Sequence, residues 1–436
     1  MKIKNFDQLA VNELRRDALN ILEAGLQAID TKKVIEDSVK IIDETLYVAS
    51  EKFVLKDFKR IFLIGVGKCA SEAALAVEMI LGDHLTDGVV IDVKSGERPK
   101  RVKFYLGSHP LPSEKNVEAT KAMIELLKQA EKDDLIIFLI SGGGSVLLCQ
   151  PENFTCQQES TLTKFLFDAG ATIEELNTVR KHLSLARGGY LAKYAYPARA
   201  VALIFSDVPG NNLNFIASGP TVLDETTVVD AKKIIERYKI SEKFPSVLNN
   251  LIETPKDAKY FEKMSNVLVV TNLLALEAMK KEAQKFGYNA EIKNTELVGD
   301  AKIFGKQIIA EFEKTPAGAL WLYGGETTVR VKGRGVGGRN QTLVLAGLEK
   351  IKKYELLLAS ASDGRDNSDF AGAICDTITL ESATELGLIP KTYLADDNSF
   401  GFFKQVGNYL EMGYTGSNVS DLILIIKNKN NWKYGK

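Results

Sequence analysis

Short apolar runs alternate with longer amphipathic stretches along most of this chain. In the first half the runs are rich in β-branched residues, are bounded by glycine, serine or aspartate, and lie at residues 61–64, 89–93, 135–140 and 201–205. Nearly continuous apolar strands separated by helices are typical of a parallel sheet that helices cover on both faces. The pattern therefore predicts an α/β fold whose first half is a Rossmann-like parallel sheet flanked by helices.

The beginning and the second half of the chain complete this prediction. Residues 1–50 place apolar side chains at helical spacing, as at Leu14, Ala18 and Leu22, so we expect helices there. Residues 241–263 are polar, and apolar runs return after them at 267–270, 320–323, 356–359 and 422–426. We therefore expect an N-terminal domain over 1–245, a C-terminal α/β domain over 246–436, and an active-site cleft between them.

Composition narrows the function classes. Lys+Arg is 56 and Asp+Glu is 57, so the chain lacks the basic excess that nucleic acids and anionic membrane surfaces attract. No apolar stretch approaches the roughly 18 residues of a membrane span. The four cysteines and three histidines show no zinc-binding spacing. We expect a cytoplasmic protein that acts on small molecules and binds neither nucleic acid nor membrane.

Candidate chemistry follows the predicted strands, because ligands of open α/β sheets bind beyond the carboxyl ends of strands. After the run at 61–64, Gly65, Gly67 and Lys68 precede a predicted helix and can approach a phosphate. The same residues fit G-x-G-x-x-A, with Asp92 in the next strand, which is a dinucleotide-binding pattern. A tight turn beside a surface lysine explains them equally well.

Two further loops of the first half carry polar groups. The SGGGS segment offers a nest of N–H donors for a carboxylate or phosphate and comprises Ser141, Gly142, Gly143, Gly144 and Ser145. Asp207 lies where another strand ends, the usual position of a carboxylate that holds magnesium or accepts a proton. It would also suit an Asx turn at the following Pro-Gly. His109 is expected in a loop, and His182 suits a packed role or a ligand.

In the second half, Glu326 and Asp363 each follow a predicted strand. Arg339 lies between Gly338 and Asn340, where little side-chain bulk would block a ligand. A guanidinium binds a carboxylate or phosphate through two parallel hydrogen bonds, so we expect Arg339 to contact a reactant. The basic residues that precede it suit a solvated loop.

The chain resembles the glycerate 2-kinase family, of the two-domain type with a MOFRL C-terminal domain. The resemblance runs in order from about residue 16 to 426, in GVGKCA, GSHPLP, SGGGS, NTVRKHLSLARGGYLA, SDVPGNN…IASGPT, GGETTV…GVGGRNQ, SDGRDNSDFAGA and TGSNVSDL. It implies ATP-dependent conversion of D-glycerate to 2-phosphoglycerate with Mg²⁺ or another divalent cation. The chain departs from the family pattern at Asn211, Thr342, Tyr190 and Arg187. We expect these changes to tune substrate preference more than to abolish activity.

The resemblance suggests roles for the candidate residues in phosphoryl transfer. Lys68 and the amides of residues 65–68 would hold glycerate or the moving phosphoryl group, and residues 141–145 would cradle an anion. Asp207 is the leading metal ligand or general base, and Asp363 is the second.

In the other half, Arg339 would bind the glycerate carboxylate or the transition-state charge. Glu326 and Asn340 would line the substrate or nucleotide site. Two alternatives stay open: an NAD(P)-dependent hydroxypyruvate reductase, supported by the glycine pattern with Asp92, and a non-enzymatic sugar-phosphate sensor. The sequence leaves open whether the chain forms a homodimer.

Overall fold

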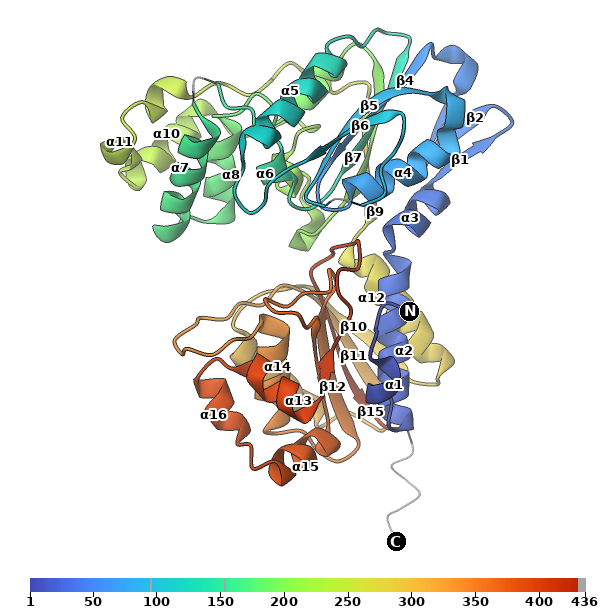
Figure 1. Ribbon diagram of the computed structural model, residues 1–436, viewed down its shortest axis with the longest axis vertical. Helices are drawn as coiled ribbons and strands as arrows, with labels where there is room; N and C mark the ends of the chain where they lie inside the picture. The colour runs from blue at the N-terminus through green and yellow to red at the C-terminus, as the bar shows by residue number, and fades with distance from the viewer. Residues whose placement is uncertain (95, 153, 430–436) are drawn as a thin grey trace. The chain divides into compact units, whose positions relative to one another are not determined.

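The computed structural model describes residues 1–94, 96–152 and 154–429, and it divides into two compact units (Figure 1). One unit comprises Thr31–Val269 and is called the parallel-sheet unit below. The other joins Met1–Asp30 to the part of the chain that begins at Val270, and is called the mixed-sheet unit. Within the described residues, no helix is long and apolar enough to cross a membrane.

The parallel-sheet unit contains a six-stranded sheet in the order β6-β5-β4-β7-β8-β9. Its strands are β4 (Arg60–Val66), β5 (Leu85–Asp92), β6 (Val102–Leu106), β7 (Asp134–Ile140), β8 (Arg199–Phe205) and β9 (Met264–Val270). The pairs β4–β5, β4–β7, β5–β6 and β7–β8 are all parallel, as the apolar runs predict. The apolar run at 267–270 extends this sheet as its edge strand β9, although it was expected in the second domain.

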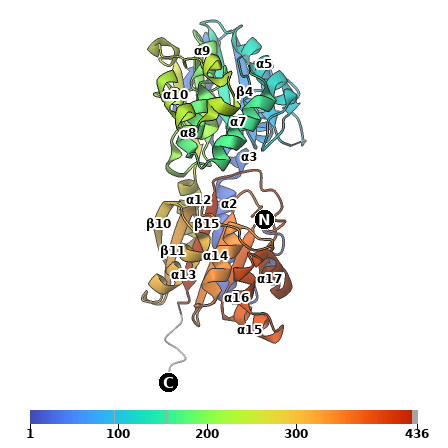
Figure 2. The same ribbon diagram turned by 90° about the vertical axis from the view of Figure 1, so that its left-hand side faces the viewer.

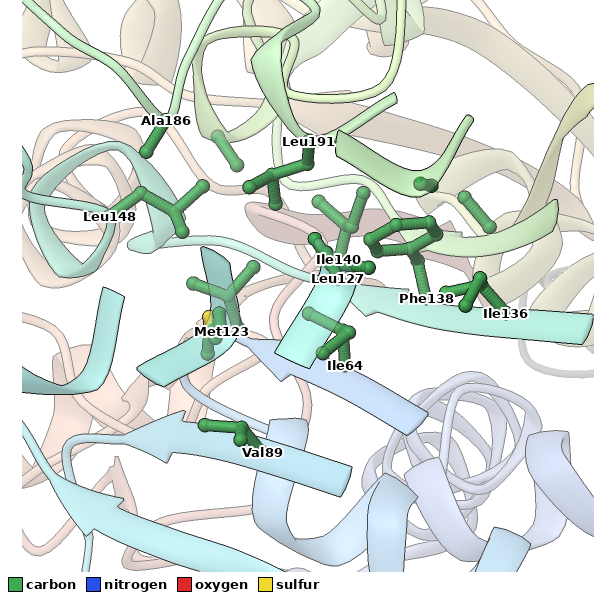
Figure 3. Close-up of a cluster of buried hydrophobic side chains, with 14 of the residues drawn as sticks. Ile64, Val89, Met123, Leu127, Ile136, Phe138, Ile140, Leu148, Ala186 and Leu191 are labelled. Atoms are coloured by element: carbon green, nitrogen blue, oxygen red, sulfur yellow. The ribbon is translucent and has the colours of Figure 1, made fainter. Parts of the chain in front are cut away.

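Alternation along the central strands directs side chains to both faces of this sheet. On one face, Met123 and Leu127 of α5 (Glu114–Leu127) pack with Ile64 and Phe138 (Figure 3). Helix α4 (Ala70–Leu81) packs against β4 and β5 with buried alanine and valine side chains. The sheet is thus a buried scaffold that holds the loops at its edge in place.

Further helices lie beside the sheet. A second core is formed by α7 (Cys156–Asp168), α8 (Ile173–Lys181), α10 (Val228–Arg237) and α11 (Ile240–Lys243), which lie together in Figure 1; Figure 2 shows α7, α8 and α10 from the side. The short helices α6 (Gly144–Leu147) and α9 (Tyr190–Ala195) follow β7 and precede β8. Helices were expected at the beginning of the chain, and the prediction is confirmed by α1 (Phe6–Leu9), α2 (Glu13–Ala28) and α3 (Thr31–Ser38).

The helical expectation is wrong for the end of this segment. Residues 39–54 form an antiparallel sheet of β1 (Val39–Ile42), β2 (Thr45–Val48) and β3 (Glu51–Val54). Short alternating strands of this kind resemble a helical pattern when only every third or fourth residue is compared.

The mixed-sheet unit contains a second six-stranded sheet, in the order β10-β11-β15-β12-β13-β14. Its strands are β10 (Asn289–Leu297), β11 (Ala319–Gly325), β12 (Glu355–Ala361), β13 (Gly372–Cys375), β14 (Tyr409–Leu410) and β15 (Asp421–Lys427). The central strand β15 runs antiparallel to both of its neighbours, β11 and β12, whereas β10 and β11 are parallel. The helices of this part are α12 (Asn272–Lys285), α13 (Ala301–Phe312), α14 (Arg339–Leu348), α15 (Thr377–Glu385), α16 (Pro390–Ala395) and α17 (Ser399–Val406).

The first 30 residues pack in the mixed-sheet unit, so the division differs from the expected boundary at 245/246. Helix α2 lies so close to α12 that a Cβ at Gly25 would come within 2.7 Å of Met279 Cγ. The guanidinium of Arg15 binds both carboxylate oxygens of Asp376, at 2.7 and 2.8 Å, and the two side chains are buried. Such long-range packing leaves no local mark in the sequence.

Candidate active site

The loops after β4, β7 and β8 meet at one edge of the parallel sheet, because these strands are parallel neighbours. The approach is close enough to require glycine. A Cβ at Gly67, where φ is +127°, would lie 2.0 Å from Ser141 Oγ. A Cβ at Gly142 would lie 1.9 Å from Asp207 Oδ2. Three of the sequence-predicted segments therefore form one site.

The loop after β4 differs from the expected amide cradle. Gly65 is a buried residue inside β4, paired with Val90 and Leu139, so it is a strand residue and not a ligand-binding one. The N–H of Gly67 donates to the Ile91 carbonyl at 3.3 Å, and that of Lys68 donates to the Gly142 carbonyl at 3.0 Å. These amides already have acceptors within the chain. The half-buried Lys68 side chain is the candidate ligand from this loop.

Asp92 holds the start of α4. It is 2% exposed, and its carboxylate accepts hydrogen bonds from the N–H of Ser71 at 3.0 Å and of Val93 at 2.6 Å. Burial raises the pKa of Asp92, and these backbone donors oppose the rise. A dinucleotide site needs this carboxylate for a ribose hydroxyl, so its buried position speaks against that use.

The SGGGS loop is different, because several of its amides lack an acceptor. Ser141 N–H donates to the Val66 carbonyl at 2.9 Å, and Gly144 N–H donates to the Ser141 carbonyl at 3.2 Å. The N–H groups of Gly142, Gly143 and Ser145 donate to no acceptor among the described residues. Consecutive free amides at a turn form a concavity that suits an anion. The structure agrees here with the nest that the glycines indicate.

Lys68 and His109 flank this nest. A Cβ at Gly143, where φ is +82°, would lie 3.2 Å from Lys68 Cγ and 3.4 Å from His109 Cδ2. Desolvation, followed by the positive charges of Lys68 and Arg180, lowers the pKa of His109 to about 4, although much of the residue is exposed to solvent. His109 is therefore neutral near pH 7. The positive charge that acts on His109 comes from Lys68 and Arg180.

Asp207 lies on the other side of the nest, half-buried after the end of β8. Its carboxylate is in contact with Gly142, whose missing side chain makes the room. The site thus has a lysine, free amides and a carboxylate on three neighbouring loops. It can bind an anion and position a hydroxyl or a metal ion beside it.

Two buried residues that the sequence did not single out support the loop. Ser218 Oγ lies 2.9 Å from Ser145 Oγ and donates to Asn177 Oδ1 at 2.8 Å. Ser218 and its neighbour Ala217 have positive φ angles of 60° and 51°. These contacts connect the SGGGS loop to α8. The only sequence signal is that both lie in segments of the family resemblance.

His182 has a structural role, which settles the choice that its sequence context left open. Its ring is fully buried, with Nδ1 2.9 Å from the Ile252 carbonyl and Nε2 3.3 Å from Thr226 Oγ1. The neighbouring Lys181 donates to Asp224 at 2.9 Å, and both side chains are buried. These contacts bind α8 to the segment that follows it.

The second group of predicted residues lies in the mixed-sheet unit, at the start of α14. The carboxylate of Asp366 accepts hydrogen bonds from the N–H of Asn340 at 3.1 Å and of Gln341 at 2.8 Å. Asp366 is fully buried, and burial raises its pKa. The amide side chain of Asn340 donates to Asp421 at 2.8 Å. Asn340 is itself fully buried, so its role is to organise the helix start.

One edge of the Arg339 guanidinium is paired with the Asp421 carboxylate. Its Nε and Nη2 donate to the two oxygens of Asp421, at 2.7 and 2.9 Å. Burial opposes the charge of Arg339, but Asp421 outweighs it and raises the pKa of the guanidinium. Burial also raises the pKa of Asp421 to about 7, against the effect of Arg339. The two parallel, charge-assisted hydrogen bonds from Arg339 favour an ionised Asp421.

The other edge of Arg339 points toward a more accessible partner. Nη1 lies 3.1 Å from Glu326 Oε1, and the Glu326 side chain is 48% exposed. This edge is the part of Arg339 that a reactant can reach by displacing Glu326. The pairing with Asp421 corrects the expectation that the whole guanidinium fork is available.

The glycine-rich stretch before Arg339 is held by acidic residues. The N–H groups of Lys332 and Gly333 donate to Asp397 Oδ2 at 2.7 and 2.8 Å. A Cβ at Gly333 would lie 2.2 Å from the Asp396 carbonyl oxygen. Its glycines therefore serve close packing and do not form a phosphate cradle.

Asp363, the second expected metal ligand, lies in a turn of the mixed-sheet unit. Asp363 Oδ1 accepts from the N–H of Arg365 at 3.1 Å, which is a local turn contact. It lies in the mixed-sheet unit, whereas Asp207 lies in the parallel-sheet unit. Among the described residues, no group of three or more His, Cys, Asp or Glu side chains could hold a metal ion.

Comparison with known proteins relates the whole chain to one group. Residues 17–253 match the model of a domain described only as being of unknown function, and residues 319–421 match the MOFRL family. The glycerate 2-kinase of Pyrococcus horikoshii is 36% identical over 433 residues, covering 95% of this chain and 97% of that protein. A putative hydroxypyruvate reductase of Agrobacterium vitis is 36% identical over 383 residues, covering 84% of this chain and 87% of that protein.

A solved structure agrees with these relatives. The crystal structure of glycerate kinase from Thermotoga maritima is similar with a TM-score of 0.84 and 33% sequence identity. The similarity covers 94% of this chain and 99% of that chain. Similarity at this level extends to both units of the fold.

Proposed function

The chain belongs to the glycerate 2-kinase family, and from this premise we propose that it transfers a phosphoryl group from ATP to the 2-hydroxyl of D-glycerate. Both reactants are small anions, which suits a chain of nearly balanced charge with local anion-binding groups. The proposed location is the cytoplasm, where ATP is available to a soluble enzyme.

The observation that carries the proposal is the composition of the site at the edge of the parallel sheet. Three loop amides without acceptors, the Lys68 side chain and the Asp207 carboxylate surround Gly142 and Gly143. Phosphoryl transfer requires alignment of donor and acceptor and neutralisation of charge on the moving group. The amides and Lys68 supply positive potential, and Asp207 supplies an acceptor for a hydroxyl proton.

The roles follow from the chemistry of each group. The amides of the SGGGS loop would bind an oxyanion, and Lys68 would neutralise charge as it develops. Asp207 would orient the 2-hydroxyl and accept its proton late in the transfer, when the oxygen has become acidic. In the mixed-sheet unit, the outer edge of Arg339 would exchange Glu326 for an anionic group of a reactant.

The site at the edge of the parallel sheet could bind a divalent cation through a single protein carboxylate. Mg²⁺ commonly binds nucleotide phosphates with one or two protein carboxylates and several waters, so the lack of a protein cage is consistent with it. Asp207 is the residue that would hold it, and Asp363 is the second candidate. When bound, the cation would supply charge neutralisation on the phosphates. Titration of turnover with Mg²⁺ and with Mn²⁺ tests this requirement.

Product analysis tests the proposed reaction. The protein is incubated with D-glycerate, ATP and MgCl₂, and the products are resolved by phosphorus NMR, which distinguishes 2-phosphoglycerate from 3-phosphoglycerate. Accumulation of 2-phosphoglycerate is the expected result. Formation of 3-phosphoglycerate would contradict the regiochemistry, and no phosphorylation at all would contradict the kinase proposal.

A reductase is the second candidate, because one relative bears that name. The geometry gives it little support, since Asp92 is buried at the start of α4 and the amides of Gly67 and Lys68 are occupied. A parallel incubation with hydroxypyruvate and NADH separates the two. NADH oxidation without glycerate phosphorylation would favour the reductase.

A further inference from the structure

Arg180 is a cation near the active-site loop, and none of the carboxylates that the structure describes forms an ion pair with it. It lies in the last turn of α8, is half-buried, and donates from Nε to Thr163 Oγ1 at 3.3 Å. Among the residues that the structure describes, no carboxylate oxygen lies within ion-pair distance of its guanidinium. Desolvating a cation without a counter-ion is costly, so a partly buried guanidinium of this kind favours an anion beside it.

The surroundings of Arg180 add to the positive charge. Burial, and after it the guanidinium of Arg187, lower the pKa of Arg180 to about 10. Arg187 is fully buried, and its Nη2 lies 2.7 Å from Glu159 Oε1. The alignment is poor, so its three guanidinium nitrogens have no hydrogen-bond acceptor among the described side chains and backbone groups. Of the two guanidinium groups, Glu159 therefore pairs with Arg187, and Arg180 feels its charge only from a greater distance.

The fold brings this charge to the SGGGS loop. Asn177, three residues before Arg180 on the same helix, is joined through Ser218 to Ser145. Residues three apart on a helix lie on one face, so Arg180 belongs to the face that meets the loop. The ring of His109, in contact range of Gly143, senses the charges of both Lys68 and Arg180. The two cations thus act on the same small region.

We propose that Arg180 is a further reactant-binding residue, which binds an oxyanion through its terminal nitrogens while Thr163 holds its Nε. Arg187 and Glu159 are positioning residues behind it. The oxyanion is the carboxylate of the hydroxy acid or a phosphate of the nucleotide, which share this chemistry. The identity of the two reactants rests on the proposed function. The presence of an anion site at Arg180 does not.

Binding measurements on the full chain distinguish the sources. Wild type, Arg180→Gln and Arg180→Lys are titrated calorimetrically with D-glycerate, with ADP and with inorganic phosphate as a minimal probe. Loss of a charge-assisted pair of hydrogen bonds should weaken the affected ligand on the order of 10- to 100-fold, with partial recovery in Arg180→Lys. Arg101→Gln, which removes a surface arginine paired with Asp83, is the matched control and should leave all three affinities unchanged.

The outcomes separate clearly. A weaker affinity for glycerate alone assigns the carboxylate, and a weaker affinity for ADP alone assigns the nucleotide. Affinities for all three ligands within twofold of wild type, in a variant with unchanged melting temperature, would overturn the proposal. If wild type turns over no glycerate but phosphate binding still depends on Arg180, the proposed function fails and this inference stands.

A spectroscopic readout covers the case in which the variants do not fold. The chain has only three histidines, so the imidazole NMR signals of His109 are readily assigned. An anion at Arg180 and Lys68 would cancel positive charge and raise the pKa of His109 in the wild-type protein. Saturation with D-glycerate or ADP should therefore shift its titration upward. An unchanged titration with both ligands would contradict the proposal.

Discussion

A buried carboxylate determines how Arg339 must be tested. Asp421 is fully buried, and its carboxylate accepts hydrogen bonds from the side chains of Arg339 and Asn340. Removing Arg339 leaves this carboxylate without its counter-charge beside Asp366, whose own charge raises the pKa of Asp421. A loss of turnover in an alanine variant would therefore mix a structural effect with a catalytic one.

A double-mutant cycle separates these effects. Arg339→Ala should destabilise the protein by about 3 kcal/mol, the lower end for breaking a buried pair, because Arg339 is 28% exposed. Arg339→Ala combined with Asp421→Asn should lose less than the sum of the two single variants, since no unpaired charge remains. Urea unfolding measures all four proteins. Additive losses would show that the pair is not coupled.

Turnover of the same double variant then reports on the reactant. If the outer edge of Arg339 binds an anion, turnover stays low even where stability recovers. Recovery of both would assign Arg339 a structural role only.

At the scale of elements, the edge of the parallel sheet depends on glycines that carry no chemistry themselves. Gly142 has no side chain because the Asp207 carboxylate occupies that space. The distance between β7 and β8 fixes this contact, since the strands are hydrogen-bonded neighbours. A small change at Gly142 should thus displace a carboxylate that acts in transfer.

Gly142→Ala should lower kcat for glycerate phosphorylation by about 100-fold or more, because small misplacements of reacting groups are that costly. Gly96→Ala is the matched control, since a Cβ there meets nothing within 4 Å. Steady-state kinetics and a thermal melt on both variants provide the test. Equal kcat values in the two would show that the Asp207 position is not critical.

Periodicity predicted the elements that are buried and continuous, and missed those that are not. β4, β5, β7 and β8 appear in the sequence as apolar runs because both of their faces are covered. β6 and β10 were not predicted, since their alternating or mostly exposed residues give no such run. The short strands at 39–54 were mistaken for helix for the same reason.

The candidate site was predictable as far as loop chemistry goes. SGGGS, Lys68 and Asp207 were identified because each follows a strand, and the structure brings them together. The sequence could not predict which backbone amides have an acceptor. The N–H of Lys68 donates to a carbonyl and that of Gly143 donates to no described acceptor, yet both follow a strand in a glycine-rich loop. The pairing of Arg339 with Asp421 joins residues 82 positions apart, which single-sequence patterns do not register.

At the scale of the whole molecule, the chain order and the packing order differ. The N-terminal helices belong with the second half through Arg15–Asp376 and the contact of α2 with α12, and β9 belongs with the first half. The chain therefore passes between the units at 30/31 and at 269/270.

This division predicts which fragment folds alone. A fragment of residues 31–269 retains all six strands of the parallel sheet, with only Val270 missing from β9, and keeps its cores, so it should unfold cooperatively in urea. A fragment of residues 1–245 lacks β9 and exposes the face of α2 that packs on α12, so it should aggregate or lack a cooperative transition. Circular dichroism during urea titration compares them. Cooperative unfolding of the fragment of residues 1–245 alone would favour the boundary at 245.

We propose that the loops at the edge of the parallel sheet carry out phosphoryl transfer to the 2-hydroxyl of glycerate. The most direct measurement is a phosphorus NMR time course of wild type, Lys68→Met and the exposed-lysine control Lys132→Met with D-glycerate, ATP and MgCl₂. We predict 2-phosphoglycerate from wild type and control at equal rates, and a rate lower by about 10²- to 10³-fold for Lys68→Met at an unchanged melting temperature. Equal rates in all three proteins, or a product phosphorylated elsewhere, would contradict the account.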